Sequence, residues 1–201
     1  MKKLNLTKRI IVLVAIVMVL LSFYSCQPTK RFDLLEEVKN KNYDVSIYYS
    51  SLPKPEKFTR VKNEYLFYND QYLEYFVVNG DSANYTKFYQ GNMLEQKTVN
   101  PKEYFNDIVE LLLQNNIFKI NNYNYVAEEL TYFLRKEVFK KVETVLNIQN
   151  LNSFTMQEVQ KTIKINIVYK TSEERIDSIE ITISNIGQAK IEKIEENTFV
   201  E

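Results

Sequence analysis

The segment YLEYFVVNGDSANYTKFY, residues 72–89, carries the clearest structural signal in this chain of 201 residues. Two runs rich in aromatic and β-branched residues, 72–78 and 83–89, flank Asn79-Gly80-Asp81. Such residues favour strands, and an Asn-Gly pair between two such runs is a strong local signal for a β-hairpin. The segment therefore predicts two antiparallel strands and a sheet built from sequential hairpins.

The strand pattern continues on both sides of this hairpin. In residues 43–49, Val45, Ile47 and Tyr49 alternate along the chain, as in a half-buried strand. Neighbouring aromatic pairs such as Phe67-Tyr68 and Tyr75-Phe76 place apolar bulk on both faces, so the sheet is either covered on both faces or lines a cavity. We also expect strands at 58–68, 93–99, within 118–127, and at 142–148, 161–169, 175–184 and 189–194.

Three segments predict helices. Residues 31–40 repeat apolar side chains at three- and four-residue spacing. At 100–103, Asn100 suits an N-cap, Pro101 the first helical position and Glu103 a capping box, which predicts a helix through Gln114. A further helix is predicted at 128–140. Runs of strands with segregated helices indicate an α+β domain rather than a parallel α/β fold.

Composition excludes several functional classes. There is no histidine, which removes the commonest general base and metal ligand, and the single cysteine leaves no usual zinc ligand set. Three scattered glycines do not make a phosphate-binding loop. Adjacent glutamate pairs such as Glu128-Glu129 indicate solvated faces rather than a two-carboxylate site. We therefore expect no enzyme, no cofactor and no metal site.

The N-terminus has the organisation of a secretory signal peptide. Lys2, Lys3, Lys8 and Arg9 precede an uninterrupted apolar run from Ile10 to Leu21. Twelve residues suit the hydrophobic region of a signal peptide, whereas a spanning helix needs roughly 20. Residues 1–25 are therefore predicted to be a signal peptide. An uncleaved signal anchor and a cytosolic protein with a buried N-terminal helix are the alternatives.

The position of Cys26 indicates a lipidation site. The residues 21–26, Leu-Ser-Phe-Tyr-Ser-Cys, resemble the lipobox of bacterial lipoproteins, in which a small residue precedes a cysteine that is diacylated and becomes the mature N-terminus. Two acyl chains anchor a protein stably where one is marginal. Residues 26–30 would then be the lipidated cysteine and a short tether, with residues 31–201 as one domain outside the cytoplasm, held on the membrane by lipid.

The net charge of the predicted mature part disfavours nucleic acid as a partner. The mature part keeps 22 of the 26 basic residues and all 26 acidic ones, a net charge of −4. Nucleic-acid binders need a basic excess or stripe. The remaining candidate partners are the membrane, reached through the diacylglyceryl cysteine, a hydrophobic ligand, and another protein.

The order of elements resembles the LolA/LppX-like lipoprotein-carrier superfamily over roughly residues 31–195. The resemblance is carried by Tyr-Leu-Phe-Tyr-Asn-Asp (65–70), Asn-Pro-Lys-Glu (100–103) and Ile-Thr-Ile-Ser-Asn-Ile-Gly (181–187), and the chain lacks the proline of the family's last strand. The family implies a strongly curved antiparallel sheet, an open half-barrel, with helices over its concave face. It also implies a cavity that binds lipid acyl chains.

Two functions follow as hypotheses. The first is a membrane-anchored carrier or binder of a hydrophobic ligand. The second is a surface-exposed adhesion or scaffold lipoprotein that contacts another protein and has no ligand cavity. Strand alternation and the helix stripes give the residues expected to line the cavity: Val45, Ile47, Phe67, Tyr75, Val77, Ile108, Leu112, Phe133 and Leu134.

Overall fold

The computed structural model describes residues 38, 42–68, 71–105 and 107–192. The chain divides into two units, residues 1–31 and 32–201, and all described residues belong to the second. The predicted signal peptide, Cys26, and the predicted helix at 31–40 apart from Val38 lie outside the described residues.

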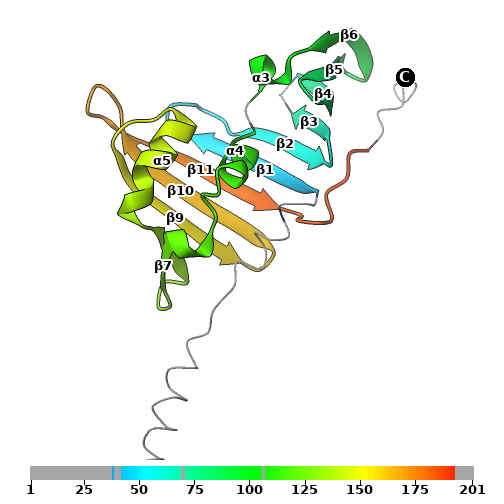
Figure 1. Cartoon of the computed structure of the whole chain (residues 1–201). Helices are drawn as coiled ribbons and strands as arrows, with labels where there is room; N and C mark the ends of the chain where they lie inside the picture. Colours follow the sequence, from blue (N-terminus) through cyan, green and yellow to red (C-terminus); the bar gives the residue numbers. More distant parts are fainter. Residues whose placement is uncertain (1–37, 39–41, 69–70, 106, 193–201) are drawn as a thin grey trace, which may run out of the picture. The chain divides into compact units, whose positions relative to one another are not determined.

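The described residues form one 11-stranded antiparallel sheet (Figure 1). Its strands lie in the order β6-β5-β4-β3-β2-β1-β11-β10-β9-β8-β7. Two sequential meanders, β1–β6 and β7–β11, are thus joined in the middle by pairing of β1 with β11. The strands are β1 (Tyr43–Tyr49), β2 (Glu56–Val61), β3 (Glu64–Tyr68), β4 (Tyr72–Asn79), β5 (Ser82–Tyr89), β6 (Asn92–Val99), β7 (Tyr123–Val126), β8 (Thr131–Leu134), β9 (Leu151–Val159), β10 (Thr162–Lys170) and β11 (Ile176–Ser184).

The hairpin at 72–89 is confirmed as β4 and β5, with Asn79 opposite Ser82. Gly80 takes φ +64° in the turn between them, a value that glycine adopts without the clash a Cβ atom causes. The single strand predicted at 58–68 is wrong. Lys62, at φ 56°, turns the chain after Val61, and the segment becomes the hairpin β2–β3.

The helix start at Asn100 is confirmed, but the helix does not run to Gln114. The Asn100 side chain accepts a hydrogen bond from the Lys102 N–H and caps α3 (Pro101–Tyr104). Asp107 then caps a second helix, α4 (Ile108–Gln114), by accepting from the Glu110 N–H. Asp is among the preferred N-cap residues, so this second cap signal divides the predicted helix.

The prediction between residues 128 and 148 is right only in part. Of the predicted helix 128–140, residues 131–134 form strand β8, and residues 136–140 are helical as the start of α5 (Lys136–Leu146). The rest of α5 occupies most of the predicted strand 142–148. Strand β9 was not predicted, since Leu151–Val159 has several polar residues. Residues 189–192, the described part of the predicted last strand, form no strand. Strands β1, β10 and β11 agree with prediction.

The predicted α+β half-barrel is also wrong, because the described residues form mostly antiparallel sheet with few helices, and the sheet is flat and not closed. Strong curvature of a sheet needs bulges or glycine kinks within strands. Here the register shifts only at Lys87/Phe88 and Val168/Tyr169 among the described pairs. Gly80, Gly91 and Gly187 all lie outside the strands.

The main core lies on one face of this sheet, where α4 and α5 cross it (Figure 1). Three rows of isoleucines in β10 and β11 form its centre, with Ile163, Ile165 and Ile167 directly opposite Ile183, Ile181 and Ile179. Residues on opposite strands at such positions share a face, so the register assigns every described strand residue to one of two faces. We call them the helix-covered face and the open face.

Candidate interaction surface

Six of the nine residues predicted to line a cavity lie between the sheet and its helices. Val45, Ile47, Phe67 and Leu134 stand on the helix-covered face, and Ile108 and Leu112 face them from α4. All six belong to the core or pack against it. The sheet and the 108–112 stripe of α4 therefore pack against each other through these residues.

The space between these elements is filled by side chains. Leu112, Val142 and Ile163 have no exposed surface, and Ile165 and Phe154 are 1 % exposed. A side chain beside a cavity that admits water would keep accessible surface, so no water-sized space borders these residues. Protein interiors normally pack this densely. Around them the structure provides no room for an acyl chain.

Tyr75, Val77 and Phe133 instead stand on the open face. Tyr75 lies opposite Leu66, Val77 opposite Glu64, and Phe133 opposite Thr155, all partners on that face. In β4 the core residues are Phe76 and Val78. Because β4 is apolar at consecutive positions, strand alternation alone could not decide which set points inward.

A buried polar cluster ties α4 to the sheet. The Arg60 guanidinium on β2 donates to the Tyr43 hydroxyl at 2.7 Å and lies 3.4 Å from Asp107 Oδ2. It also pairs with Glu110. The Tyr43 hydroxyl in turn donates to Asp107 Oδ2 at 3.3 Å, and the Arg60 guanidinium lies over the Tyr43 and Tyr65 rings.

Burial dominates the electrostatics of this cluster. It raises the pKa of the Asp107 carboxyl above its usual range, although the hydrogen bond from Glu110 N–H and the charge of Arg60 act in the opposite direction. It also raises the pKa of the Tyr43 hydroxyl, which stays protonated and can donate. With every polar group engaged in fixing α4, the cluster is best explained as a structural clamp.

The open face has an apolar half on β3, β4 and β5. Leu66 and Phe88 are 5 % and 8 % exposed, yet neither belongs to the core on the other face. Their cross-strand partners are Tyr75 and Leu73. We call this set, together with Val77, the apolar patch: Leu66, Leu73, Tyr75, Val77 and Phe88. Tyr68 and Met93, 45 % and 46 % exposed, stand on the same face at its border.

The other half of the open face, on β8 to β11, is polar. A direct cross-strand row runs from Phe133 through Thr155, Asn166 and Glu180 to Tyr48. Five adjacent strands spaced about 4.8 Å apart give this row a length of roughly 19 Å. Gln157, Lys164 and Thr182 form the middle of the neighbouring row.

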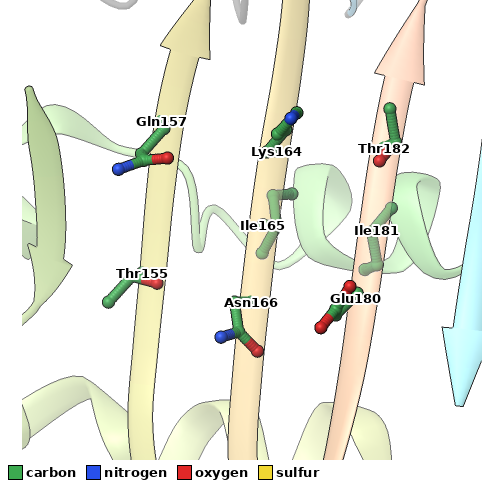
Figure 2. Close-up of a pocket in the computed structure, with 8 residues that line it drawn as sticks. All are labelled: Thr155, Gln157, Lys164, Ile165, Asn166, Glu180, Ile181 and Thr182. Carbon is green, nitrogen blue, oxygen red and sulfur yellow. The ribbon is translucent and has the colours of Figure 1, made fainter. Parts of the chain in front are cut away.

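A shallow depression of about 230 Å³ lies between these two rows (Figure 2). Its walls carry hydroxyl, amide, ammonium and carboxylate groups, while Ile165 and Ile181 belong by register to the opposite face and lie beneath it. The lining residues are Thr155, Gln157, Lys164, Ile165, Asn166, Glu180, Ile181 and Thr182. It is a surface for hydrogen bonding and not a hydrophobic cavity.

Among the described residues, no cluster of three acidic or cysteine side chains could hold a metal ion. No helix in that part of the chain combines the length and apolarity needed to cross a membrane. No protein-family model matches the chain, and no curated protein has a similar sequence.

The sequence pattern predicts neither the Arg60 cluster nor the polar rows of the open face. The Arg60 clamp joins residues 43, 60 and 107, which no local motif connects. The polar rows depend on β9, which was not predicted. The one available signal was the alternation of Lys164, Asn166, Glu180 and Thr182 with isoleucines, which already placed polar residues on one face of β10 and β11.

Proposed function

We propose that this chain is a lipid-anchored interaction module that binds another protein through the open face of its sheet. The observation that carries the proposal is the contrast between the two faces. The helix-covered face is filled by its own side chains, whereas the open face carries the partly buried apolar patch, bordered by the exposed Tyr68 and Met93, and, beyond β2 and β1, a polar depression. Protein interfaces commonly combine an apolar centre with a polar rim.

The anchor is part of the same proposal. The signal-peptide pattern and the lipobox-like residues before Cys26 support attachment to a membrane outside the cytoplasm. A tether of a few residues would keep the domain near the bilayer. There it would encounter a membrane-bound protein partner by diffusion in the plane of the membrane. A lipid carrier would need room for acyl chains, which the packing around Leu112 and Ile165 does not provide.

Site-specific photo-crosslinking in intact cells tests the proposed surface. A photoreactive amino acid replaces Asn84, which is exposed and lies opposite Val77 on the open face. We expect one discrete protein adduct, lost when Val77→Arg places a charge within the apolar patch. The same probe at Lys140, on the exposed side of α5, is the matched control and should give no such adduct.

Two results would overturn the proposal. One is a crosslinking result: equal adducts from positions 84 and 140, no adduct from position 84, or an adduct that remains in a Val77→Arg variant shown by circular dichroism to be folded. The other is one equivalent of acyl lipid bound non-covalently to the full chain in native mass spectrometry, in addition to any lipid attached to Cys26, which would favour a carrier. A probe at Asn166 shows whether the polar depression belongs to the same interface.

A further inference from the structure

Strand β6 is an open edge of the sheet. It is the last strand on its side (Figure 1). Seven of its eight residues are exposed. The opposite edge strand, β7, has only four residues, and Tyr123 is buried. A long exposed edge presents free backbone N–H and C=O groups that can pair with another strand.

The charged side chains of β6, Glu95 and Lys97, make contacts on one face of the sheet and do not point outward from its edge. The Lys97 ammonium lies 2.7 Å from Glu95 Oε1 and sits over the Tyr85 and Tyr104 rings, at 5.5 and 5.3 Å from their centres. Lysine on an edge strand often prevents pairing. Here these contacts hold Lys97 on the helix-covered face, where Tyr85 is its cross-strand partner.

We infer that β6 pairs with β6 of a second copy of this chain, in one register. Two identical antiparallel strands joined in one sheet are related by a two-fold axis perpendicular to that sheet. Facing residues then lie on the same face, and one residue lies opposite its own copy at the axis. The three central candidates for that residue are Glu95, Gln96 and Lys97.

The charge pattern selects Gln96. An axis at Glu95 or at Lys97 places two identical charges directly opposite each other, which destabilises a strand pair. An axis at Gln96 places Glu95 opposite Lys97 of the second copy, and Lys97 opposite Glu95 of the second copy. Both cross-strand pairs are then of opposite charge.

The same register extends a charge alternation that exists within the chain. On the helix-covered face, Glu74 lies opposite Lys87, and Lys87 opposite Glu95. Lys87 Nζ is 3.8 Å from Glu74 Oε1. Adding Lys97 of the second copy continues the row as acidic, basic, acidic, basic. Leu94, 57 % exposed at the irregular end of β6, comes to lie opposite Thr98 of the second copy.

Cysteine cross-linking tests the register. The full-length chain carrying Cys26→Ser, purified in mild detergent, receives Gln96→Cys. Facing residues of an antiparallel pair have Cα atoms about 4.5–5.5 Å apart, within the range of a disulfide. We expect an oxidised dimer. The control is Thr98→Cys, exposed on the same strand, because in this register the two Thr98 Cα atoms lie roughly 14 Å apart. Equal cross-linking of both variants, or none with Gln96→Cys, would overturn the register.

A charge exchange tests the association without a disulfide. By sedimentation, Glu95→Lys should weaken the dimer about tenfold, because the introduced ammonium of each copy would face Lys97 of the other. Adding Lys97→Glu to the same chain should restore the dimer. Circular dichroism checks that each variant is folded. A parent chain that stays monomeric at its highest soluble concentration, or a single variant that associates like the parent, would refute the pairing.

Discussion

At the scale of single residues, the Arg60 cluster holds together two parts of the chain that the sequence does not connect. Its guanidinium joins β2 to the first turn of α4, and only 6 % of the Asp107 side chain is exposed. Removing one member of a buried ion pair leaves the other charge without compensation. The cluster therefore makes α4 sensitive to changes at a strand far away in sequence.

Arg60→Met should lower the free energy of unfolding by roughly 3 kcal/mol, because Asp107 would stay buried without its cation. Urea unfolding measures the change. Arg175→Met is the control, since Arg175 pairs with Glu173 on the surface, where both side chains are more than two-thirds exposed. Such pairs contribute about 0–1 kcal/mol. Equal losses in both variants would contradict the clamp.

Asp107 also predicts a pH dependence. Burial raises its pKa in the folded protein, so protonation favours the folded state. The stability from this group is complete below the unfolded pKa, about 3.9, and is lost as pH rises through the folded value. The parent chain should therefore lose stability relative to Asp107→Asn as the pH rises above about 4. Parallel urea-unfolding curves for the two proteins across this range would refute the raised pKa.

At the scale of elements, the sequence predicts turns and helix starts more reliably than the lengths of helices and strands. Asn79-Gly80 determined one hairpin and Asn100 one helix start, since each acts through its own backbone. Lys62 carries no such signal, although the chain turns there. The residues of β8 and α5 carry none either, and there the predicted helix and strand differ from the observed ones. There tertiary packing decides between conformations that local preference leaves close in energy.

The β4–β5 turn gives a prediction at this scale. At Gly80 φ is +64°, and a Cβ added there would meet no atom within 4 Å. Gly80→Ala should therefore destabilise through backbone strain alone, by about 1 kcal/mol. Gly80→Asn should cost less, because Asn tolerates this conformation. Thermal unfolding compares the two, and an Asn variant as unstable as the Ala variant would show that strain is not the cause.

At the scale of the whole molecule, the sequence predicted an antiparallel sheet but not its shape. Alternating isoleucines identify β10 and β11 as strands whatever the curvature of the sheet. Curvature and cavity volume depend on how side chains from distant strands and helices fill the space between them, which alternation does not specify. For the same reason the predicted cavity residues were divided between two faces.

The predicted anchor can be tested on the complete chain. Cells expressing it with radioactive palmitate should label the parent and not Cys26→Ser, because a hydroxyl cannot form the thioether that carries the diacylglyceryl group. The Cys26→Ser chain should also leave the membrane fraction to a larger extent. Equal labelling of the two chains, or no labelling of the parent, would end the lipoprotein proposal without affecting the pairing of β6.

The meeting of β1 with β11 has a consequence for how the protein comes to be folded. Every other strand pair joins neighbours along the chain, whereas Val45 must find Ile183, 138 residues away. The cost of closing so long a loop slows folding. As the polypeptide is made, the first meander can assemble early, but one edge of β1 stays unpaired until β11, the last described strand, is available. Until then β1 has an unpaired edge that can bind other strands, and a chaperone that shields residues 43–49 would raise the yield of folded protein.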